Sequence, residues 1–117
     1  MHVRIVQAIP VFTKAAEVMQ NNVKPYIINL DVYSVWYKEP PAYRIYVDGE
    51  LMTERTFLAT EYEFYRERIC VNLEPGVHSF VFERLPTKSP EDRLSIKNFL
   101  VNKTPTKLDN NQFTISE

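Results

Sequence analysis

The dipeptide Asp48-Gly49 constrains the fold of this chain more than any other feature, because it separates two runs of alternating residues in YRIYVDGELMTERTF. Apolar or aromatic residues occupy every second position from 43 to 47, and after the dipeptide Leu51, Thr53, Arg55 and Phe57 alternate with Met52, Glu54 and Thr56. A two-residue turn of type I′ needs positive φ at both central positions, which Asp tolerates and Gly adopts freely. Because the chain has only two glycines, placing one here is informative, and the stretch predicts a β-hairpin.

Further alternating runs predict additional strands between turns. Besides the hairpin, they are residues 2–12, 25–35, 62–73, 77–84, 93–102 and 112–116. Residues 13–20 have helical spacing instead, and Pro75-Gly76 has the sequence of a type II turn. We therefore expect a single all-β domain over residues 1–117. The expected fold is an antiparallel β-sandwich of the jelly-roll type, with about eight strands and one short helix.

The segment EYEFYRER, residues 61–68, mixes acids, arginines and aromatic residues so densely that it has no simple apolar face. We expect Tyr62 and Phe64 on its buried side and ion pairs on the other side. Such a strand is typical of a sheet edge that is protected by charge.

Charge and cysteine content narrow the function classes. Lysine and arginine number 14 against 15 acids, a formal net charge of -1, and we see no basic face of the kind that nucleic-acid binding requires. The single cysteine cannot form an internal disulfide or a Cys/His zinc cluster. No run approaches the ~20 apolar residues that span a bilayer, and the start of the chain does not resemble a signal peptide. We expect a soluble protein from a reducing cytosol that binds neither nucleic acid nor membrane.

Groups suited to catalysis are sparse. A Cys70/His78 dyad is conceivable across the turn at 75–76, because we expect the strands on its two sides to be antiparallel neighbours. A lone strand cysteine is, however, more often a small half-buried residue. Both glycines fall in turns, which excludes a glycine-rich phosphate loop. Acids such as Asp31 and Asp48 could assist calcium binding, although their spacing favours ordinary ion pairs. We expect no enzymatic activity, no metal site and no cofactor.

Three large rings, Tyr33, Trp36 and Tyr37, lie at the end of one predicted strand, just before a Pro-Pro turn. Clustered rings can stack on a sugar or anchor a protein interface. They can equally cover one end of the sandwich core, and the sequence leaves these alternatives open.

A resemblance extends from Tyr43 to Glu83. The hairpin YRIYVDGELMTERTF, the charged strand after it and the segment VNLEPGVHSFVFE together resemble small virion-associated β-sandwich proteins of tailed bacteriophages, particularly marine ones. Those proteins carry a YRVYVD-x-x-L-x-TERT-[FW] hairpin and a later PG-x-H/Y turn. The same stretch is similar to the sandwich of calcium-dependent carbohydrate-binding modules. The segment LATEYEF lacks the tryptophan that the phage proteins have there.

The resemblance implies a bacteriophage virion protein, made in the host cytoplasm and assembled into the particle. We expect a capsid decoration or cement protein that binds the major capsid protein or another virion protein, as a homo-oligomer or in many copies. The alternative is a carbohydrate- or host-surface-binding module, a tail or fibre accessory that takes a glycan. The predicted partner-binding residues are Tyr33, Trp36, Tyr37, Thr53, Glu54 and Arg55.

Overall fold

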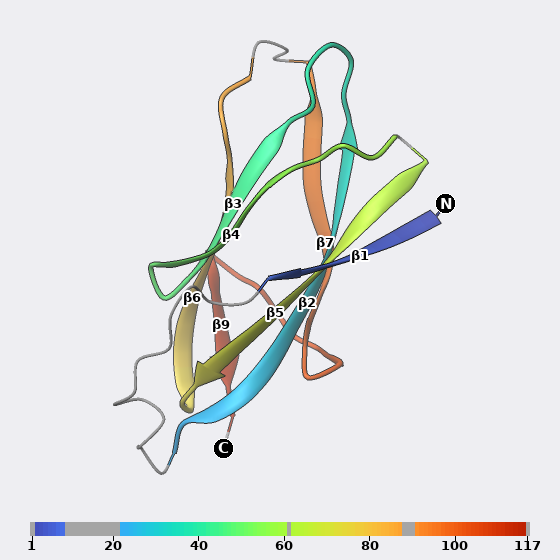
Figure 1. Cartoon of the computed structure of the whole chain (residues 1–117). Helices are drawn as coiled ribbons and strands as arrows, with labels where there is room; N and C mark the ends of the chain where they lie inside the picture. Colours follow the sequence, from blue (N-terminus) through green and yellow to red (C-terminus); the bar gives the residue numbers. More distant parts are fainter. Residues whose placement is uncertain (1, 9–21, 61, 88–90, 117) are drawn as a thin grey trace.

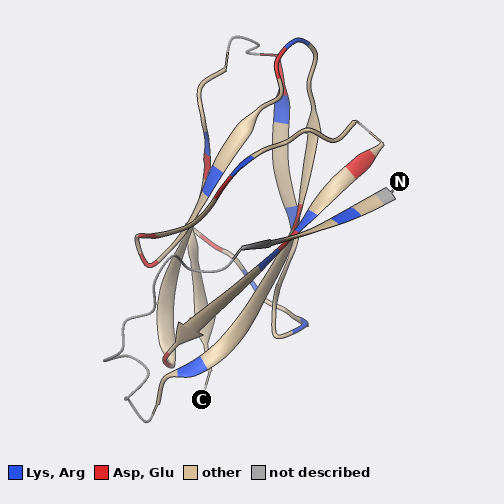
Figure 2. Cartoon of the chain, in the orientation of Figure 1, with Lys and Arg blue, Asp and Glu red and all other residues tan. Residues whose placement is uncertain are grey.

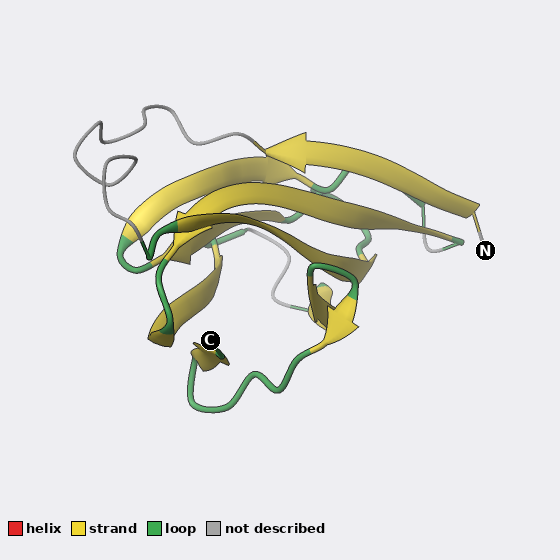
Figure 3. Cartoon of the chain, turned by 90° about the horizontal axis from the view of Figure 1, so that it is seen from below, coloured by secondary structure: helices red, strands yellow, loops and turns green. Residues whose placement is uncertain are grey.

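The computed structural model describes residues 2–8, 22–60, 62–87 and 91–116, which form two packed β-sheets in a body of 48 × 25 × 25 Å (Figure 1). The five-stranded sheet has the order β1-β5-β2-β7-β8, with β1 (His2–Ala8), β5 (Glu63–Leu73), β2 (Lys24–Val35), β7 (Arg93–Val101) and β8 (Thr104–Pro105). The four-stranded sheet has the order β4-β3-β6-β9, with β4 (Glu50–Thr56), β3 (Ala42–Val47), β6 (Gly76–Arg84) and β9 (Gln112–Ile115). In Figure 3 the larger sheet arches over the smaller one.

The prediction of an all-β, sandwich-like fold is confirmed, and the described residues form nine strands, of which β8 has only two residues. The predicted helix at 13–20 lies outside the described residues, and the described ranges contain no helix. Accordingly, no helix within those ranges is long and apolar enough to cross a membrane. One pairing corrects the prediction of a fully antiparallel sandwich, because β1 and β5 run parallel. Parallel neighbours need a long connection, and here β2, β3 and β4 lie between them in the sequence.

The hairpin at Asp48-Gly49 is confirmed, with φ of 51° and 78° at the two positions. The structure has two more pairs of consecutive residues with positive φ, at Asn102-Lys103 and Asn110-Asn111. The first pair joins β7 to β8 and the second precedes β9. Neither pair contains glycine, which makes these turns hard to predict from sequence, although Asn tolerates the left-handed region better than most residues.

The core lies between the two sheets and is built by the alternation of each strand. From the five-stranded sheet it receives Ile28, Leu30, Val32, Tyr65, Ile69, Leu73 and Val101. From the four-stranded sheet it receives Tyr43, Ile45, Val47, Met52, Phe80, Phe113 and Ile115. Phe57 and Ala59, in the segment after β4, complete it.

Two local predictions for β5 and β6 were wrong. Tyr62 is exposed and Phe64 lies on the outer face, whereas Tyr65 and Glu67 are buried. The opposite face turns inward because the Tyr65 ring packs on Phe57, with ring centroids 4.7 Å apart. In addition, the turn at 75–76 does not close a hairpin, since β5 and β6 belong to different sheets.

Candidate binding face

The outer face of the five-stranded sheet carries a hollow of about 460 Å³ that is centred on a buried carboxylate. Its polar lining comes from β2, β5, β7 and the turn after β7: Asn29, Asp31, Arg66, Arg68, Asn98 and Lys103. These side chains share a face because Asp31 pairs with Arg66 across β2 and β5, and Asn29 pairs with Arg68. Strand alternation then points all four outward.

Asp31 is only 2% exposed although it lies on the outer face, because two neighbours cover its carboxylate. Arg66 Nε donates a hydrogen bond to Oδ1 at 2.9 Å, and Arg66 Nη2 lies 3.4 Å from Oδ2. Asn98 Nδ2 donates to Oδ2 at 2.9 Å. The hydrogen bonds and the charge of Asp31 raise the pKa of Arg66 above its usual value, outweighing the partial burial of the guanidinium.

A β-bulge brings Asn98 to Asp31. Asp31 pairs with Lys97 and Asn29 pairs with Leu100, so β7 has one more residue than β2 in this interval. Asn98 has a φ of 58°, in the left-handed region that Asn tolerates. Bulges redirect side chains and are frequent beside functional sites. Here the bulge points Asn98 outward and lets Phe99 pack inward on the rings of the core.

Two cations of the hollow, Arg68 and Lys103, have no ion pair or side-chain hydrogen bond within the described parts of the chain. The backbone that carries Lys103 is nevertheless fixed, because its neighbour Asn102 is anchored to β2. Asn102 N–H donates to Ile27 O at 2.8 Å, and Ile27 N–H donates to Asn102 Oδ1 at 2.9 Å. The lining of the hollow therefore carries more positive than negative charge, with Asp31 as the one acid among its described residues. Figure 2 marks where the charged residues lie along the strands.

An aromatic stack lies next to this hollow. The Tyr33 and Phe64 rings have centroids 4.8 Å apart and planes inclined by 22°. Lys97 Nζ lies over the Tyr33 ring at 5.0 Å, and the Arg66 guanidinium carbon lies over the Phe64 ring at 5.7 Å. Cations over ring faces are attracted by the ring quadrupole. Both rings are thus already engaged by protein groups.

A second charged cluster lies between the sheets. Glu67 of β5 is fully buried and receives hydrogen bonds from Arg55 Nε at 2.6 Å and Arg55 Nη2 at 3.1 Å, and also from the Tyr43 hydroxyl. Burial and the Glu67 charge raise the pKa of Tyr43, so its hydroxyl stays protonated as a donor. For Arg55, burial opposes the charged form, but the bonds to Glu67 outweigh it and raise the pKa. Because Arg55 belongs to β4 and Glu67 to β5, this cluster connects the two sheets.

His78 ties the β3–β4 turn to β6. Its Nδ1 lies 2.7 Å from Asp48 Oδ2, and its Nε2 lies 2.7 Å from the Glu74 carbonyl oxygen. Both partners are acceptors, so both contacts are hydrogen bonds only when the imidazole is protonated. Burial lowers the pKa of His78, but these two acceptors outweigh it and raise the pKa above its usual value.

The predicted ring cluster is divided among different environments. Tyr33 is in the outer stack, whereas the Trp36 Nε1–H donates to Ala59 O at 2.9 Å and its ring packs against the core. Tyr37 is 61% exposed and lines a small hollow with Trp36 and Thr60. Trp36 therefore covers one end of the core, which is one of the alternatives that the sequence analysis left open for the ring cluster.

The predicted TERT residues point in two directions. Thr53 and Arg55 face inward together, with Arg55 Nη2 3.3 Å from Thr53 Oγ1. Glu54 faces outward and its Oε1 accepts a hydrogen bond from Arg44 Nε. Arg44 Nη1 also lies 3.8 Å from Glu83 Oε1. The Arg55 side chain is thus occupied by Glu67, and the sequence could not indicate this because Glu67 was expected on the exposed side of its strand.

The structure separates the two residues of the alternative dyad and pairs both acids that were considered for calcium binding. Cys70 lies on the outer side of the five-stranded sheet, whereas His78 faces the interior from the other sheet. The carboxylates of Asp31 and Asp48 are both held by cationic or imidazole partners. Within the described residues, no group of three or more His, Cys, Asp and Glu side chains could hold a metal ion.

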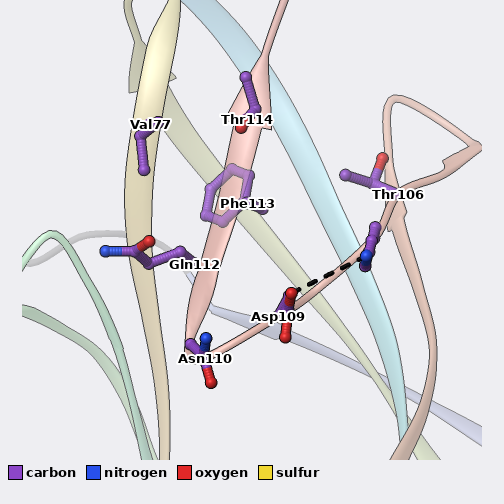
Figure 4. A pocket seen from close by; sticks show the side chains of 8 residues that line it. Val77, Thr106, Asp109, Asn110, Gln112, Phe113 and Thr114 are labelled. Carbon is purple, nitrogen blue, oxygen red and sulfur yellow. Dashed lines mark ion pairs between the residues drawn. The ribbon is translucent and has the colours of Figure 1, made fainter.

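A further hollow of about 360 Å³ lies beside β9 (Figure 4). Phe113 from β9 and Val77 from β6 form part of its wall, and Lys107 and Asp109 lie at its rim with 3.8 Å between Nζ and Oδ2. Because both of these charged groups are exposed and compensate each other, this hollow offers less to a charged ligand than the Asp31 hollow does.

Sequence reasoning missed most of the Asp31 hollow. Arg66, Arg68, Asn98 and Lys103 were not predicted as a site, because only the strand order brings them together. Comparisons of the chain with protein-family models, with curated proteins and with solved structures found no match.

Proposed function

We propose that this chain is a non-catalytic virion component, a capsid decoration or cement protein that binds coat subunits through the outer face of its five-stranded sheet. The observation that carries the proposal is the Asp31 hollow, where a buried carboxylate holds Arg66 and Asn98, and where Arg68 and Lys103 lack acidic partners among the described residues. The Arg66 side chain, already held by Asp31, loses little side-chain entropy on binding.

The assignment to a virion comes from the resemblance of the hairpin and of the VNLEPGVHSFVFE segment to phage proteins. A compact sandwich bound in many copies at lattice junctions would stabilise a shell by mass action, since a ligand of the assembled state favours that state. We also propose that the sandwich is of the jelly-roll type. Of the predicted partner-binding residues, Tyr33 adjoins the proposed face and Tyr37 and Glu54 are exposed.

Mass spectrometry of purified particles from the source tests this proposal. We expect many copies of the chain in each particle, which has one tail, and a copy number comparable with that of the coat subunits. Its presence only in cell lysate, with none in the particles, would contradict the proposal.

The alternative of glycan binding has one specific observation in its favour, next to Tyr37. Asp92 is 2% exposed and its Oδ1 accepts a hydrogen bond from Tyr37 N–H at 3.1 Å. Its Oδ2 is buried and has no hydrogen-bond partner in the part of the chain that the structure describes. A buried acceptor beside an exposed ring could accept a sugar hydroxyl.

A glycan array with the wild-type chain and Tyr37→Ala tests the alternative. Binding that disappears in Tyr37→Ala and resists a chelator would support it. If the array shows no binding by the wild-type chain, the alternative fails.

A further inference from the structure

We infer that the Asp31 hollow is a carboxylate-binding site, and that its occupant is an extended acidic segment of the protein partner. This inference rests on the proposed function and names the chemistry of the surface that the partner presents.

The hollow has donors that its own acid does not use. Asp31 engages Nε and Nη2 of Arg66, which leaves Nη1 for a ligand. Arg68 and Lys103 lack acidic partners among the described residues. A guanidinium fork and an ammonium group around one hollow are the groups that proteins use to hold a carboxylate.

The outer face of the other sheet shows why this excess of donors is particular to the hollow. There Arg44 bonds to Glu54 and lies 3.8 Å from Glu83, so its cation is already neutralised. The exposed apolar residues of that face, Val77 and Val81, offer no complement to an acid. Charge complementarity therefore directs an acidic partner to the five-stranded sheet.

A protein segment fits the surroundings better than an acidic sugar. The Tyr33 and Phe64 rings are engaged by each other, by Lys97 and by Arg66, so neither offers a free platform to a pyranose ring. The hollow extends to Ile5 on β1, which is 71% exposed. Because β1 is the edge strand of its sheet, its outer backbone groups can pair with an extended segment. Alternate side chains of that segment would then face the hollow.

Isothermal titration with a synthetic peptide of alternating glutamate and threonine tests the site, with a glutamine–threonine peptide as the matched neutral probe. We expect the acidic peptide to bind, the neutral one to bind at least about tenfold more weakly, and added salt to weaken the acidic complex. Arg68→Glu/Lys103→Glu should lose about tenfold or more in affinity. The control Lys38→Glu/Lys107→Glu makes the same change in net charge at exposed cations outside the hollow and should bind as the wild type does.

Several results would overturn the site. These are equal binding of both peptides, equal losses in the two double variants, or binding of polygalacturonate without binding of the peptide. Unchanged denaturation midpoints of the variants will show that they fold. If Arg68→Glu/Lys103→Glu decorates particles as well as the wild type, the carboxylate site is wrong while the capsid proposal stands. If the peptide results hold but particles lack the chain, the capsid proposal fails and the site stands.

Discussion

Arg66 and Glu67 are neighbours on β5, yet they belong to two ion pairs with opposite surroundings. Glu67 points into the sandwich, is fully buried and is bonded by Arg55 and Tyr43. Arg66 points outward to Asp31, and its own side chain remains 43% exposed beside a hollow. Both carboxylate oxygens of Glu67 are bonded by protein groups, whereas the outer pair has further cations beside it.

The difference indicates a division of roles between the two faces of one sheet. A buried carboxylate with two bonded partners connects the sheets, and removing one partner leaves an uncompensated charge in the interior. The outer cluster is anchored by a similar pair but faces water, so its loss costs less stability. We propose that the inner cluster supports the fold and that the outer cluster binds a partner.

The largest effect is expected for Arg55→Ala, which leaves Glu67 buried without its cation. We expect the free energy of unfolding to fall by about 3–5 kcal/mol. Urea denaturation followed by tryptophan fluorescence measures the change. The double variant Arg55→Met/Glu67→Leu should recover much of the loss. A loss below about 1 kcal/mol in Arg55→Ala would mean that this pair stabilises the fold no more than an ordinary surface ion pair does. That result would contradict the difference between the two clusters.

A smaller loss is expected for Arg66→Ala. Asp31 keeps its hydrogen bond from Asn98, and water can enter where the half-exposed guanidinium was. We expect the free energy of unfolding to fall by about 1–2 kcal/mol, measured in the same denaturation assay. A loss as large as that of Arg55→Ala would show that the outer cluster is as structural as the inner one.

The smallest effect is a dependence on pH at His78. The pKa of His78 is higher in the folded state than in the unfolded state. His78 therefore makes its full contribution to stability below the unfolded-state pKa of about 6.5. It is lost as pH rises through the folded pKa, so stability should decline there. His78→Gln should remove this part of the decline in denaturation curves taken across neutral pH. A variant that keeps the full wild-type dependence would assign the effect to another group.

The sequence predicted those parts of the fold that depend on local residues. Asp48-Gly49 fixed one hairpin, and alternation located most of the strands. Alternation could not show which face of β5 points inward, because EYEFYRER has aromatic and charged residues on both sides. The choice depends on Phe57 and Arg55, which meet β5 only in the folded sandwich.

The candidate site was less predictable than the fold for a similar reason. Tyr33 was singled out as part of a ring cluster, but its ring contacts come from Phe64 and Lys97 on other strands. The bulge at Asn98 has no glycine to mark it, and the neighbours of Asp31 come from distant parts of the sequence.

The most direct test of the central claim is an NMR titration of the isotope-labelled chain with the glutamate–threonine peptide. The account predicts that backbone amide shifts concentrate at Arg66, Arg68, Asn98 and Lys103 and along β1, while the Arg55 amide is little changed. Shifts centred on Tyr37, or on the outer face of the four-stranded sheet, would contradict it.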